Sequence, residues 1–95
     1  LDVVGEVRDS AMEVLTIARR LADIANPNLI SDVGVAAELA LGTVRAAGIN
    51  TAVNLAGYKD EADAAAVREE ADAATAEAER LAAETRDIVL ATINR

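Results

Sequence analysis

Two segments of the chain, about 2–25 and 60–93, place apolar residues alternately three and four positions apart, which constrains both to be helices. In the first segment these positions are Val4, Val7, Ala11, Val14, Ala18, Leu21 and Ala25. In the second they are Val67, Ala71, Ala74, Ala78, Leu81, Thr85 and Ile88. Residues at these intervals share one side of a helix and form the line along which helices pack in a bundle. We therefore predict two long amphipathic helices.

A third helix is predicted between them, over about 32–56. Asn26-Pro27 ends the first helix, because the residue before a proline is disfavoured in the α region. Ser31 is the expected N-cap of the middle helix, since its hydroxyl could accept a hydrogen bond from the first turn. Gly57 is the expected C-terminal cap.

Small residues are spread around the middle helix, three of them glycines: Gly34, Gly42 and Gly48. A glycine inside a helix costs roughly 1 kcal/mol relative to alanine. We therefore expect neighbouring backbones to approach this helix closely on more than one side, as they would for the central helix of an assembly.

The fold class that follows is all-α, a bundle of about three long helices in a single partial domain spanning 1–95. The apolar fraction is 53%, but the only aromatic residue is Tyr58 and alanine supplies much of the rest. Alanine forms helices readily, but its side chain buries little apolar surface. Burial of apolar surface stabilises a fold by roughly 25 cal/mol per Å², so an alanine-rich core contributes little stability. We expect the bundle to be completed by a second copy or a partner segment. Tyr58 itself could be a wedge at a turn or a platform for a flat ring.

The net charge of −8 and the absence of cysteine and histidine exclude several classes of function. Phosphates of nucleic acids and anionic membrane surfaces would be repelled. Without cysteine and histidine there is no thiolate site, and the commonest metal ligand and general base are missing. We expect no nucleic-acid partner, no membrane partner, no metal and a cytoplasmic location. The chain begins at Leu1 without an initiator methionine, and we expect a partial product.

Four polar residues of the middle helix fall within about 40° of one another on a helical projection. They are Asp32, Thr43, Asn50 and Asn54, and they share this stripe with Ala36, Leu39 and Ala46. Asp32 and Asn50 are about 27 Å apart along the axis, so they cannot contact the same few atoms from one chain. They would mark the two ends of a long ligand or belong to two different pockets at subunit contacts.

Each of these residues has a structural and a functional interpretation. Asp32 could simply stabilise the helix dipole, or it could face a cationic substrate as a charged base or electrostatic partner. Asn50 and Asn54, on a helix expected to be buried, could bond neighbouring helices or a ligand. Arg45 could contact a ligand, or pair with Glu38 or with an acid on a neighbouring helix.

Two runs of the sequence, 26–40 and 45–55, resemble the cyclodeaminase family, which includes the cyclodeaminase domain of formiminotransferase-cyclodeaminase and bacterial methenyltetrahydrofolate cyclohydrolases. The first run has Ser-Asp-x-Gly-Val at 31–35 after an Asn-Pro loop. The second has an Arg-Ala-Ala run followed by Asn50 and Asn54 one turn apart. Members of this family are all-helical, elongated and dimeric, and about twice as long. The chain resembles the C-terminal half of their domain.

The resemblance implies a folate-dependent enzyme that needs neither a metal nor a covalent nucleophile. It would convert 5-formimino-tetrahydrofolate to 5,10-methenyl-tetrahydrofolate and ammonia, or hydrolyse the methenyl compound, with activity that could depend on the missing half. Asp32 would be the catalytic residue, and Asn50, Asn54 and Arg45 would bind the tetrahydrofolate substrate. The implied partners are a homo-oligomer or the missing N-terminal half. The alternative is a non-catalytic helical interaction module that keeps the family fold.

Overall fold

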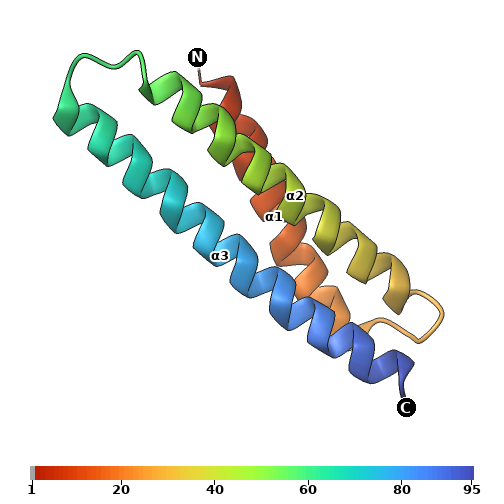
Figure 1. The fold of residues 1–95 in the computed structure, drawn as a ribbon. Coiled ribbons are helices and arrows are strands. Elements are labelled where there is room, and N and C mark those ends of the chain that lie inside the picture. The colour runs from red at the N-terminus through yellow and green to blue at the C-terminus, as the bar shows by residue number, and fades with distance from the viewer. Residues whose placement is uncertain (1) are drawn as a thin grey trace.

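The structure, a computed structural model, describes residues 2–95 and folds them into three long helices: α1 (Val3–Ile24), α2 (Ile30–Leu55) and α3 (Glu61–Ile93). Successive helices run in opposite directions and are joined by short connections, so the chain forms an up-and-down bundle (Figure 1). The bundle measures 54 × 20 × 16 Å. The predicted all-α bundle of about three helices is confirmed.

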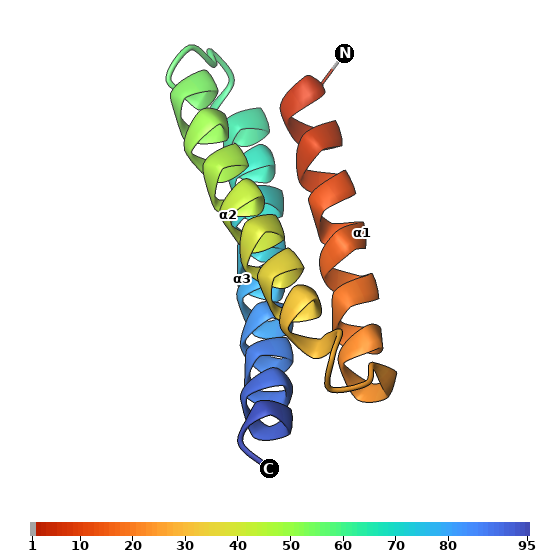
Figure 2. The same cartoon turned by 90° about the vertical axis from the view of Figure 1, so that its right-hand side faces the viewer.

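The middle helix, α2, is the central one. It packs extensively against both α1 and α3, whereas α1 and α3 contact each other much less. The two views show α1 and α3 along two different sides of α2 (Figures 1 and 2). Close packing explains one of its glycines, since a Cβ at Gly34 would lie 3.2 Å from Cγ1 of Val89 on α3.

The helix α2 begins two residues before the predicted start, and the prediction that Ser31 is its N-cap is wrong. The carboxamide oxygen of Asn26 accepts hydrogen bonds from the backbone N–H groups of Asn28 (2.9 Å) and Leu29 (3.2 Å). This Asx turn already bends the chain into a helical path. Ile30 then fills the core as the first helical residue, with 1% of its surface exposed. Ser31 therefore lies inside the first turn, and Leu29 occupies the N-cap position.

The prediction that Gly57 caps α2 is also wrong. The helix ends at Leu55 with Ala56 as its C-cap, and no glycine among residues 2–95 has a positive φ. The chain continues in right-handed turns instead, with the N–H of Gly57 donating to the carbonyl of Asn54 and that of Tyr58 to Leu55. These bonds satisfy the last carbonyls without the left-handed residue of a glycine cap.

The helices α1 and α3 have side-chain caps. The carboxylate of Asp2 accepts a hydrogen bond from the N–H of Gly5 at 2.9 Å. At the start of α3, one carboxylate oxygen of Asp60 accepts hydrogen bonds from the N–H groups of Ala62 (2.9 Å) and Asp63 (3.2 Å). Both caps satisfy donors that an α-helix leaves free at its N-terminus.

The core runs along the axis between the helices, and it corrects the predicted packing line of α1. Val7, Val14 and Leu21 are 45%, 44% and 42% exposed. The residues of α1 that are buried in the core are Ala11, Leu15, Ala18 and Ala22. Only Ala11 and Ala18 belong to both sets, because α1 turns the Leu15 side towards its two neighbours. The packing line of α3 agrees better with the prediction, since Ala71, Ala78, Leu81 and Thr85 are buried.

Apolar side chains lie on both sides of α2. One side enters the core with Ile30, Val33, Ala37, Ala40, Leu41, Val44 and Ala47. The opposite side is exposed, and Leu39 there leaves 69% of its surface uncovered. A helix that is apolar all round is typical of a position covered on all sides.

Candidate ligand surface along α2

The stripe of polar residues predicted on the middle helix lies on the exposed side of α2. Asp32, Thr43, Asn50 and Asn54 are all exposed, so the expectation that Asn50 and Asn54 sit on a buried helix does not hold for this chain. From Asp32 to Asn54 the helix rises by about 33 Å. The chain therefore spreads the candidate residues along its length rather than gathering them in one pocket.

Asp32 lies in the first turn of α2, at one end of the bundle. Its position is that of an acid that stabilises the helix dipole. Next to this turn an apolar groove of about 510 Å³ runs between α2 and α3. Its apolar lining includes Val35, Leu39 and Leu90. Arg86 and Glu38 also line it and form an ion pair at 3.5 Å.

Arg45 lies near the middle of α2 and faces α3. Its guanidinium is 3.4 Å from the carboxylate of Glu79. Of the two expected pairings, the one with an acid on a neighbouring helix is therefore found, and the one with Glu38 is not. Both side chains are about half exposed. They border a shallow depression that also contains Asp72 and Thr75. Arg45 keeps part of its surface open to a ligand there.

Asn54 lies at the opposite end from Asp32, in a recess lined largely by polar residues. This recess, the polar end pocket, has a volume of about 310 Å³ and lies where the start of α1, the end of α2 and the first turns of α3 meet. It is lined by Asp2, Val4, Arg8, Thr51, Asn54, Leu55, Tyr58, Val67 and Glu70. Tyr58 therefore forms part of a pocket wall as well as following the end of a helix.

Arg8 organises the polar end pocket, and sequence reasoning missed it. Its side chain is only 13% exposed and bonds Glu70 at 3.0 Å and Asp9 at 3.2 Å. The sequence does indicate its position: Arg8 comes one residue after Val7 and three before Ala11, so it lies beside the packing face of α1.

Thr51 is a second residue of this pocket that the sequence analysis did not single out. Each of the other five threonines donates its hydroxyl to a carbonyl one turn back, but Thr51 has no such bond among residues 2–95.

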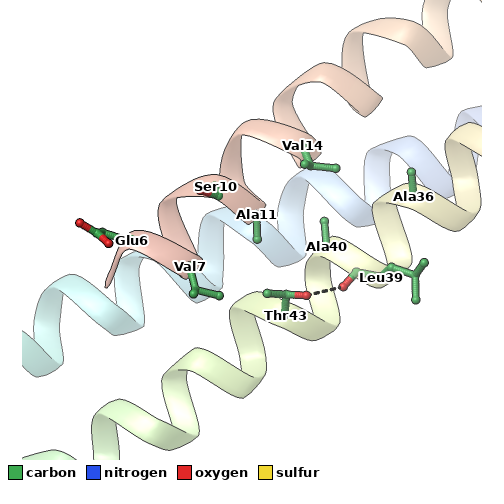
Figure 3. A pocket seen from close by; sticks show the side chains of 9 residues that line it. All are labelled: Glu6, Val7, Ser10, Ala11, Val14, Ala36, Leu39, Ala40 and Thr43. Carbon is green, nitrogen blue, oxygen red and sulfur yellow. Dashed lines mark hydrogen bonds between the residues drawn. The ribbon is translucent and has the colours of Figure 1, made fainter. Parts of the chain in front are cut away.

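A fourth hollow lies between α1 and α2 on the exposed apolar side. This groove has a volume of about 580 Å³, and Figure 3 shows the side chains that line it. Val7 and Val14 from α1 and Leu39 from α2 border it, with Ala11 and Ala40 at its base. The only hydrogen bond drawn there is the one from the hydroxyl of Thr43 to the carbonyl of Leu39, at 3.0 Å. The groove is mostly apolar, and Glu6, Ser10 and Thr43 are the polar residues in its lining.

A network of ion pairs lies away from these hollows, where Arg19 of α1 meets charged residues of α3. Arg19 bonds Glu84 at 3.1 Å, and Arg80 bonds both Glu84 and Glu77. Hydrogen bonds from Arg19 and then Arg80 lower the pKa of Glu84, and the bond from Arg80 lowers the pKa of Glu77. Of these bonds, the one from Arg19 to Glu84 joins α1 to α3, whereas those of Arg80 lie within α3.

Two features are absent from residues 2–95: a cluster of metal-binding side chains and a membrane-spanning helix. In that range no three His, Cys, Asp or Glu side chains are grouped so that they could hold a metal ion. None of the three helices combines the length and the apolarity that a membrane span requires.

The fold and the surface define a class: an all-α bundle whose central helix has an uncovered apolar side and hydrogen-bonding side chains near both ends. The family model for formiminotransferase-cyclodeaminase matches residues 2–73, and the chain belongs to this family. The match covers all of α1 and α2 and the first turns of α3. Neither the curated proteins nor the solved structures gave a match. The family is associated with a folate-related enzyme.

Proposed function

We propose that the chain is the C-terminal part of a folate-dependent cyclodeaminase or cyclohydrolase. The observation that carries this proposal is the family match over residues 2–73, which includes Asp32, Arg45, Asn50 and Asn54. The substrate is a one-carbon derivative of tetrahydrofolate, and the protein acts in the cytoplasm as a homo-oligomer or together with an N-terminal half.

In the cyclodeaminase reaction the protonated formimino group on N5 of the folate is attacked by N10. A bond forms between N10 and the formimino carbon, and the bond from that carbon to its terminal nitrogen breaks. The proton lost by N10 goes to the departing nitrogen, which leaves as ammonia, and the positive charge stays on the methenyl product. A carboxylate beside this carbon stabilises the cation and relays the proton.

Asp32 is the residue of α2 that suits this role. It is exposed in the first turn of the helix, where a negative charge interacts favourably with the helix dipole. In the cyclohydrolase version the same carboxylate orients the water that attacks the methenyl carbon. The bond from that carbon to N5 then breaks, one proton of the water passes to N5, the other is released to solvent, and the formyl group stays on N10. Asn50 and Asn54 supply amide hydrogen bonds to the folate, and Arg45 supplies positive charge for its carboxylates.

The first test follows the near-ultraviolet absorbance band of 5,10-methenyl-tetrahydrofolate. Wild-type protein, alone and supplied with an N-terminal half of the family domain, should consume this band or form it from the formimino substrate. Asp32→Asn should lower the rate by about 10²-fold or more, the usual contribution of a positioned acid–base group.

Asp63→Asn is the matched control, because Asp63 is an aspartate in the first turn of α3 as Asp32 is in that of α2. It should keep the wild-type rate. Equal rates for wild type and Asp32→Asn would remove Asp32 from the mechanism. No turnover of either substrate, with both halves present, would contradict the enzymatic proposal.

The uncovered apolar side of α2 favours the second candidate, a helical interaction module that keeps the family fold. Such a module would bind a helical partner through Leu39 and its neighbours and would turn over neither folate. The absorbance assay separates the two candidates, because only the enzyme changes the methenyl band.

A further inference from the structure

The bundle is packed unevenly along its length. Its connected core is built from buried residues of 11–44 and 78–89. Beyond this core lies a helical hairpin, residues 48–70, which we call the tip: the end of α2, the connection and the start of α3 (Figure 1). Leu55 is the only buried residue in 48–70, and it does not belong to the connected core. Little buried apolar surface therefore holds the tip in place.

Side-chain hydrogen bonds add one link between the tip and the rest of the bundle. Among residues 2–95, the bond from Arg8 of α1 to Glu70, at 3.0 Å, is the only one of this kind. The side chain of Glu70 is 70% exposed, and an ion pair with an exposed partner contributes little stability. The two bonds of the Asp60 cap lie within the tip itself. They stabilise the start of α3 without joining it to α1.

Gly48 lies inside α2, where the tip begins. Glycine is the least favourable residue in a helix apart from proline. A Cβ at this position would lie 3.6 Å from Oγ1 of Thr75, an ordinary contact, so close packing does not require a glycine there. The helix therefore has a weak point at the boundary between the core and the tip. Segments with few buried contacts open at a lower free energy than the core of the same protein.

We propose that the tip opens as one unit while the core of the bundle stays folded, and that it thereby acts as a lid on the polar end pocket. Six of the nine residues that line this pocket belong to the tip, and the other three belong to the start of α1 and its N-cap. Each opening therefore separates the two walls of the pocket, and each closure rebuilds it. A small molecule held between the walls would favour the closed state, because it contacts both walls only there. The lid does not rest on the reaction proposed above.

Hydrogen exchange of the full chain tests the separate opening. Backbone amides of the tip, after correction for their intrinsic rates, should exchange at least about a hundredfold faster than those of the core, because local opening exposes them without unfolding of the bundle. Their rates should respond only weakly to urea, because a local opening exposes little surface. Equal protection along α2, from the core into the tip, would overturn the inference.

Two glycine substitutions in α2 provide a matched pair. Gly48→Ala should slow exchange of the tip by about fivefold, because alanine stabilises the closed helix. Gly42→Ala is the control, since a Cβ there meets no atom within 4 Å but the residue lies level with the core. It should slow exchange of the core amides by a similar factor and leave the tip unchanged, because the tip opens without breaking the helix at Gly42. Slowing of the tip by both variants would show one cooperative unit and refute the lid.

A pair of arginine variants tests whether opening separates the tip from α1. Arg8→Ala removes the bond to Glu70 and should speed exchange of the tip by about two- to fivefold. Arg19→Ala is the control, since Arg19 also bonds an acid of α3, Glu84 at 3.1 Å, but outside the tip. It should leave exchange of the tip at the wild-type rate. An unchanged tip in Arg8→Ala would show that the tip opens without leaving α1, and the lid on the pocket would be rejected.

Discussion

At the scale of single residues, the core relies on very few large side chains. Leu15, Ile30 and Val44 are the apolar residues that are both large and fully buried, and most of the remaining core is alanine. The fourth large buried side chain is Thr85, whose hydroxyl donates to the carbonyl of Leu81 at 2.7 Å within its own helix. Each large apolar residue therefore contributes an unusual share of the buried area.

Leu15→Ala should consequently destabilise the bundle by about 2–5 kcal/mol, the range for a buried leucine whose site cannot collapse fully. Denaturation with urea, followed by helical circular dichroism, measures the change in the free energy of unfolding. Ile24→Ala removes a similar volume from an exposed position and should cost less than about 0.5 kcal/mol. Equal losses for the two variants would contradict the described core.

At the scale of elements, the helix starts are set by the side chains that reach the first-turn N–H groups rather than by the most favourable residue type. Asp60 makes two such hydrogen bonds for α3. Ser31 makes none for α2, because the turn at Asn26 has already started that helix. Ser31 and Asp60 are both residue types that favour the N-cap position. Only Asp60 stabilises its helix by capping.

Asp60→Ala should cost about 0.5–2 kcal/mol, the usual loss on removing an N-cap. Ser31→Ala should change stability by less than about 0.5 kcal/mol, as exposed substitutions usually do. Thermal unfolding of the two variants beside wild type makes the comparison. A larger loss for Ser31→Ala than for Asp60→Ala would restore Ser31 as the cap.

At the scale of the whole molecule, the tie between α1 and α3 makes stability depend on pH. Bonds from Arg19 and Arg80 hold the pKa of Glu84 below its usual value of 4.5. A carboxylate with a lowered pKa stabilises the fold above its unfolded pKa, and this contribution is lost as the pH falls through the folded pKa. The melting temperature should therefore drop below about pH 4.5, and Glu84→Gln should show a smaller drop. Identical acid profiles would show that this network contributes nothing.

The sequence predicted the number and type of helices because the three-and-four spacing and the single proline are local signals. It placed the packing line of α1 on Val7 and Val14, because both faces of that helix carry apolar residues and only the tertiary contacts of Leu15 decide between them. The shared stripe of Asp32 and Asn54 follows from helix geometry. The polar end pocket does not, because Arg8 and Glu70 are brought together by the fold from helices far apart in sequence.

Tyr58 is the only aromatic side chain and stands in the wall of the polar end pocket. All intrinsic fluorescence of the chain therefore comes from one phenol, located where the three helices meet. A ligand entering that pocket would change the emission without any label, whereas events at the Asp32 end of the same copy would be silent. The protein thus carries its own optical reporter for one end of the bundle.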